Sequence, residues 1–394
     1  MSSSTVPVVV GAAAGSGKTR AVTVSPISQP GGMTVHWLST ASSGTFVQVI
    51  EAASYSGAFP ADAIKAKATV TATTLTDPET KKKLYEHKSV FYDLKPGTAY
   101  KWLITDGANG KGATGGFTTP VSEEGKTFTF GFVTDPQAVD AAGYAPLRTT
   151  FERMLGIAPD LSFVLLGGDV VDNGSKTAQW WGLHEAAGAF LSSLPVLSAP
   201  GNHEYKDDAK LAAYKAFWGL PATGPSGMGE SCYTVKNGDA RFYMLDTQAS
   251  LDKQIVWLKS ERAAEDSKWN IVVMHRGIYG SFYDEKEFRA KLAPVFDELG
   301  IDLVLSGHDH NWVRTTMKGG KKVLPGTGTT YITGGSAGRK YYDDVKRTWT
   351  EVFYGGKTPS FTVVKVAQDR LEIVAAHIDG TKTVQHDAFV IRKN

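Results

Sequence analysis

Five short polar motifs follow one another in the second half of the chain, and each comes directly after an apolar segment typical of a strand. Each motif combines Asp, Asn or His with a small or turn-forming neighbour. They are Thr134-Asp135-Pro136-Gln137, Gly168-Asp169-Val170-Val171-Asp172, Gly201-Asn202-His203-Glu204, Met274-His275-Arg276 and Gly307-His308-Asp309-His310. Because the carboxyl ends of strands in layered α/β proteins border one crevice, we expect these motifs to converge.

The side chains in these motifs suit a metal site. Carboxylate, carboxamide and imidazole ligands bind divalent first-row metals and ferric iron. With two ions, one carboxylate must bridge, and Asp169 is the best candidate because Gly168 lets the backbone fit closely. Two metals about 3.5 to 4 Å apart hold a hydroxide and clamp the attacking and leaving oxygens of a phosphoryl group. The motifs therefore predict hydrolysis of a phosphate ester.

The elements that must position these motifs have the rhythm of an α/β fold, in which strands alternate with longer helical stretches. Strands are predicted at 128–133, 161–166, 196–198, 241–245, 270–274 and 303–305, and helices at 145–155 and 176–191. The end of the chain is β-rich and predicts a second sheet from strands at 361–366, 371–376 and 388–391. We assign the catalytic domain to residues 127–394.

Residues 21–120 have a different pattern, in which short β-branched and aromatic segments such as 33–38 and 45–50 alternate with turns. This spacing is typical of a β-sandwich. A Pro-Gly turn after Leu94 leads to Tyr100, whose hydroxyl could bond back to the turn as a tyrosine corner. The last strand is expected at 117–119, followed by a linker to Lys126.

Composition sets broad limits on the protein. The 394 residues, 42% of them apolar, exceed what one hydrophobic core usually organises. The formal charge of +2 gives no overall field that favours nucleic acid or an anionic membrane. The single cysteine, Cys232, excludes an intramolecular disulfide and a Cys-rich zinc site. No apolar run is long enough to span a bilayer.

Residues 1–20 are expected to form a flexible leader without the basic start and apolar core of an intact signal peptide. Within it, Val8 to Thr19 fits a relaxed phosphate-loop pattern that would indicate an NTPase. That pattern requires a helix from Lys18 onward, whereas Arg20 to Pro26 is typical of a strand that ends in a proline turn. We therefore expect no nucleotide site there.

Together, the five motifs resemble those of the metallophosphoesterase superfamily, and from Ala21 to Asn394 their setting is similar to its purple acid phosphatase branch. The fibronectin type III-like first module and three further segments carry this resemblance. The segments are Gln254 to Leu258, His275 to Tyr279 and His308 to Arg314. The resemblance implies a four-layer α/β (α+β) metallophosphoesterase sandwich behind an all-β immunoglobulin- or fibronectin-like one. It also implies two metal ions, of Fe, Zn or Mn.

The resemblance also implies a role for each residue. The first metal would be held by Asp135, Asp169 and His310, and the second by Asp169, Asn202, His275 and His308. A metal-bridging hydroxide would attack phosphorus in line, with His203 stabilising the transition state or protonating the leaving oxygen. Separately from the resemblance, nearness to the ligands in sequence makes Tyr279, Tyr283, Trp312 and Arg314 candidates for the wall of the substrate pocket, and Arg276 is a further candidate.

Two positions depart from the family pattern. The branch has a tyrosine three residues after the bridging aspartate, where this chain has Asp172, and the superfamily has a histidine where this chain has Gln137. The first metal thus lacks both usual extra ligands. Either the Gln137 carbonyl oxygen or a water would complete its shell, with Asp172 as a neighbour of the ligands.

Several residues near the motifs have simpler interpretations. Glu204 is predicted to be a carboxylate at a helix start rather than a general base. Asp309 is expected to point away from the metals. The remaining histidines sit in strand, turn or helix contexts without ligand-type neighbours, and we expect structural roles for them. They are His36, His87, His184, His377 and His386.

The function predicted from the sequence is hydrolysis of small phosphomonoesters. The alternatives are phosphodiester or pyrophosphate hydrolysis at the same site, where Arg276, Arg339 and Lys340 would meet extra substrate charge, and a binding module with an inactive metal site. No nucleic-acid partner is expected. By analogy with exported relatives, a periplasmic or secreted location is favoured.

Overall fold

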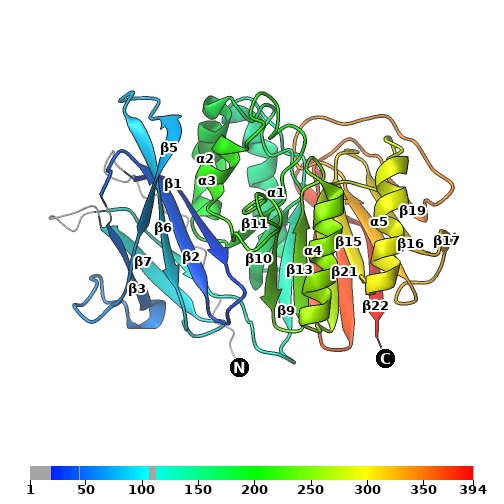
Figure 1. Ribbon diagram of the computed structural model, residues 1–394, viewed down its shortest axis with the longest axis horizontal. Coiled ribbons are helices and arrows are strands. Elements are labelled where there is room, and N and C mark those ends of the chain that lie inside the picture. The colour runs from blue at the N-terminus through cyan, green and yellow to red at the C-terminus, as the bar shows by residue number, and fades with distance from the viewer. Residues whose placement is uncertain (1–18, 44, 106–111, 394) are drawn as a thin grey trace.

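The computed structural model describes residues 19–43, 45–105 and 112–393. Strands β1 to β8 form two antiparallel four-stranded sheets, in the orders β1-β2-β6-β5 and β4-β3-β7-β8 (Figure 1). Their bounds are β1 Thr19–Pro26, β2 Met33–Ser39, β3 Phe46–Glu51, β4 Ile64–Lys67, β5 Thr69–Thr76, β6 Lys83–Phe91, β7 Ala99–Thr105 and β8 Thr114–Thr118. Trp37 and Trp102, one from each sheet, share a single buried cluster, so the sheets pack as a sandwich.

The start of β1 corrects the expected leader. Thr19 and Arg20 belong to this strand and pair with Ser39 and Leu38 of β2, so the strand begins one residue before the predicted start at Arg20 and inside the range given to the leader. The rest of the predicted leader, including the glycines and Lys18 of the phosphate-loop pattern, lies outside the described residues. Thr19 begins a strand where a phosphate loop would require a helix.

The tyrosine corner is confirmed. The backbone N–H of Lys95 donates to the Tyr100 hydroxyl over 3.0 Å, and Tyr100 is buried against Phe117 of β8. Such a bond ties the loop before β7 to the body of the sheet. The all-β part of the predicted fold is therefore present.

The rest of the chain is built on two larger sheets, in the orders β11-β10-β9-β20-β21-β22 and β12-β13-β14-β15-β18-β16-β17, with β19 paired to β16. The first contains β9 Phe128–Val133, β10 Leu161–Leu166, β11 Val196–Ser198, β20 Ser360–Val366, β21 Arg370–Asp379 and β22 Lys382–Arg392. The second contains β12 Tyr233–Asn237, β13 Ala240–Leu245, β14 Trp269–Arg276, β15 Leu303–Gly307, β16 Trp312–Lys318, β17 Lys321–Lys322, β18 Thr329–Gly334 and β19 Val352–Tyr354.

The sequence predicted that the β-rich end of the chain forms a second sheet of its own, and this prediction is wrong. Strand β20 pairs antiparallel with β9, with Thr362 opposite Phe132, and β21 and β22 follow outward. Strand β10 occupies only one edge of β9, and an unpaired edge leaves backbone N–H and C=O groups without partners. The C-terminal strands satisfy that edge, and the second sheet comes from β12 to β19 instead.

Helices lie outside the two sheets, which gives the four layers predicted (Figure 1). The helices are α1 Ala145–Ile157, α2 Thr177–Leu191, α3 Ala212–Trp218, α4 Leu251–Ala264 and α5 Lys286–Leu299, with short 3-10 helices η1 Ala52–Ser54 and η2 Ala142–Tyr144. Along β14, Ile271 and Val273 face the core shared with the first sheet, while Val272 and Met274 pack in the cluster that contains α4 and α5. This alternation follows from the period of two in a strand.

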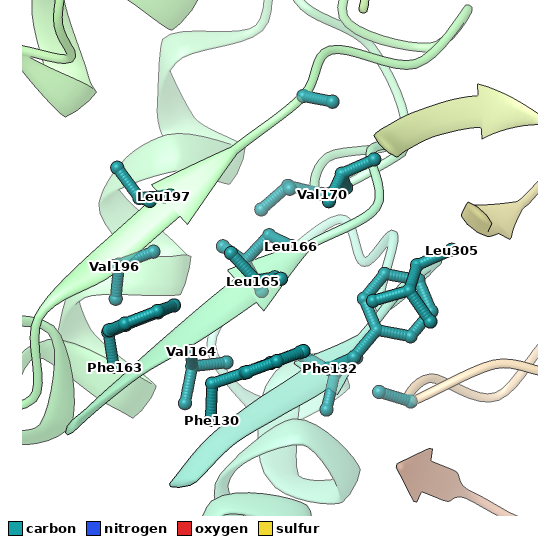
Figure 2. Close-up of a cluster of buried hydrophobic side chains, with 14 of the residues drawn as sticks. Phe130, Phe132, Phe163, Val164, Leu165, Leu166, Val170, Val196, Leu197 and Leu305 are labelled. Carbon is teal, nitrogen blue, oxygen red and sulfur yellow. The ribbon is translucent and has the colours of Figure 1, made fainter. Parts of the chain in front are cut away.

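Apolar side chains fill the space between the two sheets. Figure 2 shows Phe130, Phe132 and Phe163 of β9 and β10 in this core, with Leu305 of β15 reaching in from the other sheet. Phe130 meets Phe242 of β13 edge to face, with ring centroids 5.2 Å apart. The strands that end at the ligand motifs are thereby held rigidly. No helix among the described residues is long and apolar enough to cross a bilayer.

The first sandwich packs directly on helices α2 and α3. The Thr23 hydroxyl donates to the Trp218 carbonyl over 3.1 Å, and the Lys88 ammonium donates to the Leu220 carbonyl over 2.7 Å. In α2, His184 stacks on Phe217, and both its ring nitrogens are buried without a hydrogen-bond partner among the described residues. Burial lowers the pKa of His184 to about 3, so its neutral form belongs to the folded state.

Replacing His184 with Leu should reduce the acid sensitivity of the fold. In the unfolded chain this imidazole has a pKa near 6.5, so below that pH unfolding takes up a proton that the folded protein excludes. Stability therefore falls as pH decreases, and the loss from this one group reaches about 2 kcal/mol at pH 5. Urea unfolding of metal-free protein at about pH 7.5 and pH 5 measures it.

Between about pH 7.5 and pH 5 the unfolding free energy of both proteins should fall. We expect the fall in His184→Leu to be about 2 kcal/mol smaller than the fall in the wild type. The matched control is Glu185→Gln, a change at the exposed neighbouring position of α2, which should keep the wild-type pH dependence. Equal losses in the wild type and His184→Leu would contradict the assignment of a neutral, buried histidine.

Candidate metal centre

The ligand motifs leave their strands in sharp turns. Four of their residues have left-handed backbone conformations, with φ of 54° at Asp135, 49° at Asp169, 74° at His308 and 56° at His310. Positive φ is uncommon outside glycine and marks sites where surrounding structure holds a strained conformation. These turns direct side chains from β9, β10 and β15 to one place.

Gly168 explains why the second motif needs glycine. Its φ is 89°, and a Cβ atom there would lie 2.7 Å from the backbone nitrogen of Gly201 and 2.9 Å from Nδ1 of His275. Such distances are shorter than real Cβ contacts. The glycine therefore allows two of the ligand loops to approach the end of β10 closely.

Two groups of buried ligand atoms lie at this place and share one carboxylate. They are Asp169 with His275 and His308, and Asp169 with Asp135 and His310. His275 Nε2 lies 3.2 Å from Asp169 Oδ2, and His310 Nε2 lies 3.2 Å from Asp135 Oδ1. The shared position of Asp169 is the one expected of a carboxylate that bridges two ions.

Asn202 and the orientations of the histidines complete the arrangement. Asn202 Oδ1 lies 3.1 Å from His275 Nε2. On their outer sides, His275 Nδ1 donates to the Gly167 carbonyl over 2.9 Å and His310 Nδ1 donates to the Lys340 carbonyl over 2.6 Å. These bonds leave each Nε2 free to bind a metal, as outer partners of metal-bound histidines do. All six predicted ligands are thus brought together.

The electrostatics of the cluster fit cations. Burial opposes ionisation of Asp169, but His275 and His203 hold its pKa well below the usual range. Burial lowers the pKa of His275, but Asp169 raises it more strongly, to about 9, so a metal ion that binds to this ring must displace a proton. Burial and the neighbouring His275 lower the pKa of His308 to about 2, so this ring is neutral. An ionised carboxylate beside a neutral imidazole is a ready donor pair.

Gln137 provides the clearest sign of an additional ligand. Its Oε1 atom is buried and has no hydrogen-bond partner among the described residues. Its backbone N–H donates to the Asp169 carbonyl over 3.0 Å, which keeps it at the first group. A buried acceptor without a donor is costly unless a cation, a water or an ion satisfies it. The residues present therefore fit a pair of metal ions.

His203 lies beside the ligands, as the sequence predicted. Its Nδ1 donates to the Asp172 carbonyl over 2.6 Å, and its Nε2 lies 3.7 Å from Asp169 Oδ2. The Asp172 carboxylate is 44% exposed and lies 3.4 Å from His203 Nδ1. Asp172 is therefore a neighbour of His203, not a replacement for the missing tyrosine ligand.

Glu204 has a role that the sequence did not reveal. Its carboxylate accepts hydrogen bonds from four backbone N–H groups of the ligand loops, over 2.6 to 3.2 Å. The donors are Asp169, Val170, Val171 and Gly201. No helix begins here, because residues 202–207 form turns, so the predicted helix-start role is wrong. Burial and Asp169 raise the pKa of Glu204 to about 7, while the N–H donors oppose this rise.

The predicted pocket residues divide into two groups. Arg276 is at the site, with Nη1 3.3 Å from His308 Nε2 and 2.6 Å from Glu285. Tyr279 instead packs on Tyr331 in the core beneath α5, with ring centroids 4.7 Å apart. Trp312 is also a core residue and donates to Thr362 between the sheets over 3.3 Å. Both aromatic predictions are corrected, since large rings near strand ends fill the core here.

Other aromatic rings contact the ligands. Tyr283 stacks on His308 at 4.3 Å between centroids, and Tyr342 lies 4.5 Å from His310. Asp309 points away from the ligands and accepts the backbone N–H of Tyr283 over 3.1 Å, which fixes the loop that carries this ring. Tyr342 was missed because it follows no motif and comes from the loop after β18. Arg314 is paired with Glu351 and Asp387, away from the ligands.

Glu204→Gln should destabilise the protein by about 2 to 5 kcal/mol. The carboxylate now accepts hydrogen bonds from backbone N–H groups through both oxygens, and in the variant an NH₂ group, which cannot accept them, would replace one oxygen. Chemical denaturation of the metal-free protein measures this loss. The control is Glu152→Gln on the exposed side of α1, which should change stability by less than about 0.5 kcal/mol. Similar stability of the two variants would refute the role of Glu204 in holding the loops.

Comparisons with known proteins agree with this geometry. Residues 128–312 match the family described as Calcineurin-like phosphoesterase. Purple acid phosphatase 18 of Arabidopsis thaliana is 26% identical over 199 residues, which cover 45% of this chain and 45% of that protein. Acid phosphatase type 7 of Mus musculus is 24% identical over 323 residues, which cover 74% of this chain and 69% of that protein. The match thus spans less than half the length of the first relative.

The fold also matches a solved structure. The purple acid phosphatase PPD1 from yellow lupin (Lupinus luteus) seeds superposes with a TM-score of 0.77 at 17% sequence identity. The match covers 95% of this chain and 74% of that one, and it includes the all-β first part. Residues 128–312 therefore match the calcineurin-like phosphoesterase family, and the chain is similar in sequence to purple acid phosphatases and has the fold of one of them.

Proposed function

We propose that this protein is a binuclear-metal hydrolase of phosphate esters whose substrates are phosphomonoesters. The observation that carries the proposal is the pair of buried ligand groups that share Asp169. The first ion would be held by Asp135, Asp169, His310 and Gln137, and the second by Asp169, Asn202, His275 and His308. Bound ions supply a Lewis acid that activates water and neutralises charge on the phosphoryl group. The same proposal assigns residues 21–120 and 127–394 to separate domains.

His203 is the proton donor in this proposal. The Asp172 carbonyl fixes Nδ1 and leaves Nε2 turned towards the ligand cluster, where the ester oxygen would depart. Protonation of a departing oxygen by a positioned imidazole typically contributes about 10²- to 10⁴-fold to the rate. The same ligands would serve phosphodiesters or pyrophosphate, so substrate comparison belongs to the test.

The test compares turnover of 4-nitrophenyl phosphate and bis(4-nitrophenyl) phosphate by protein loaded with Mn, Zn or Fe. Asp169→Ala should abolish both metal binding and turnover, because both ligand groups contain this carboxylate. His203→Ala should keep the metal and reduce kcat by about 10²- to 10⁴-fold, because it loses only the proton donor. Elemental analysis of each purified variant gives the metal content.

If the protein binds no metal and turns over neither substrate after loading, the proposed enzymatic function is refuted. The alternative of a binding module with an inactive metal site would then be favoured. Faster turnover of the diester than of the monoester would favour the phosphodiesterase alternative. Full activity in His203→Ala would refute its role as the proton donor.

Gln137→Leu should weaken the first ion selectively. If Gln137 Oε1 is a ligand, the variant should bind one equivalent of metal tightly and the second at least about tenfold more weakly, as loss of a supporting ligand contact does. Calorimetric titration of metal-free protein measures both steps. The control, Gln385→Leu at an exposed position of β22, should bind like the wild type. Unchanged affinities in Gln137→Leu would assign the position to a water.

A further inference from the structure

Three nitrogen groups converge beside the metal ligands, and the family pattern accounts for only one of them. Gln137 Nε2 and Lys206 Nζ each lie 3.3 Å from Nε2 of His203. The other nitrogen of this ring, Nδ1, lies 2.6 Å from the Asp172 carbonyl and 2.8 Å from Lys206 Nζ, so the ammonium lies alongside the ring and close to both nitrogens. Amide and ammonium nitrogens are hydrogen-bond donors, and a cluster of donors suits an anionic oxygen placed among them.

Lys206 is held at this point by its backbone. Its N–H donates to the His203 carbonyl over 3.2 Å, and its own carbonyl accepts the N–H of Ser175 over 3.3 Å. Ser175 belongs to the loop after Asp172, so the turn after His203 is fixed to that loop. The backbone of Lys206 is therefore fixed beside this loop, and its ammonium lies 2.8 Å from His203 Nδ1.

The Lys206 ammonium retains capacity for a ligand. Among the described residues, Nζ has the Asp172 carbonyl at 3.2 Å as its one oxygen partner, and its other close neighbour is the His203 ring, with Nδ1 at 2.8 Å. The nearest carboxylate oxygen, Asp172 Oδ1, lies 3.9 Å away. An ammonium has three N–H donors and the side chain is 44% exposed, so an incoming anion can reach it.

The other cations near the ligands are engaged in other contacts. Arg276 is bonded to Glu285 over 2.6 Å, which offsets its charge. The Lys340 ammonium lies over the Tyr342 ring, 5.4 Å from its centroid. Lys206 is thus the cation best placed to meet substrate charge on the His203 side of the ligand cluster.

The distances allow one phosphoryl group to reach both the ligands and this donor cluster. His203 Nε2 lies 3.7 Å from the shared carboxylate of Asp169. An oxygen about 2.8 Å from His203 Nε2 can be equally close to Lys206 Nζ, because the two nitrogens are only 3.3 Å apart. A terminal phosphoryl oxygen that carries full negative charge suits such a position.

We propose that Gln137, His203 and Lys206 form a cradle for the terminal oxygens of the substrate phosphoryl group, and that Lys206 makes the site selective for dianionic phosphomonoesters over monoanionic diesters. This inference rests on the proposed function. A phosphomonoester carries close to two negative charges at neutral pH. In a diester a second ester group replaces one charged oxygen, so the ammonium gains less from binding it.

The test uses the full chain loaded with metal and the variant Lys206→Met. Affinity for inorganic phosphate is measured by calorimetry, and KM and kcat are measured for 4-nitrophenyl phosphate and its bis ester. Loss of a charge-assisted hydrogen bond should weaken phosphate binding by about 10- to 100-fold and raise the monoester KM similarly. The diester kcat/KM should change by less than about threefold, so the preference for the monoester falls.

Two further variants separate charge from structure. Lys206→Arg keeps the charge and should recover most of the phosphate affinity. Lys210→Met removes an exposed lysine four residues away and should behave like the wild type. All variants should have wild-type metal content and thermal midpoint, since the Lys206 side chain contributes little to the core.

The outcomes for this inference and for the proposed function are distinct. Unchanged phosphate affinity and an unchanged ratio of monoester to diester turnover in Lys206→Met would overturn the cradle, even with a fully active enzyme. A wild type that binds phosphate through Lys206 but hydrolyses neither ester would overturn the proposed function and support the cradle.

Discussion

The carboxylate of Asp169 is the interaction on which the rest of the site depends. It belongs to both ligand groups, contacts His275 at 3.2 Å and accepts the backbone N–H of His203 over 2.8 Å. Isolated in the interior, such a charge would cost several kcal/mol. The surrounding imidazoles and N–H groups offset that cost, and bound cations would complete the compensation. The loops therefore have to be arranged around this one group.

Rigidity of the strand ends makes that arrangement possible. Left-handed residues such as Asp135 and His308 are retained only where neighbouring structure over-determines them, and each costs of order 1 to 3 kcal/mol. Packing in the core between the two sheets fixes the strands, and the Glu204 carboxylate accepts hydrogen bonds from backbone N–H groups of two loops. Strain at the ligands is thus balanced by packing and hydrogen bonds a few ångströms away.

The two departures from the pattern that the sequence resembles lie beside the same ring: Gln137 Nε2 lies 3.3 Å from His203 Nε2, and Asp172 Oδ1 lies 3.4 Å from His203 Nδ1. Gln137 is neutral, as a metal-bound histidine at that position would be, whereas Asp172 stands where a tyrosinate would add negative charge to the first ligand group. Asp172 turns its carboxylate outward beside His203 and Lys206, where it is 44% exposed. The negative charge of Asp172 therefore lies at the rim of the ligand cluster, next to His203 and Lys206.

The sequence by itself determined many of the strands and which residues are candidate ligands, because both follow from local patterns. Strands β9, β10 and β11 have their predicted bounds, and all six ligands lie in the predicted motifs. Only the tertiary structure decided that β20 pairs with β9. It also decided that the rings of Tyr283 and Tyr342 contact the candidate ligands, whereas Tyr279 and Trp312 pack in the core. The contacts of Glu204 and Lys206 likewise became visible only in the folded chain. Periodicity fixes which face of an element is buried but not which distant segment covers it. These contacts join residues far apart in the chain or depend on the path of a turn, and neither leaves a local signal in the sequence.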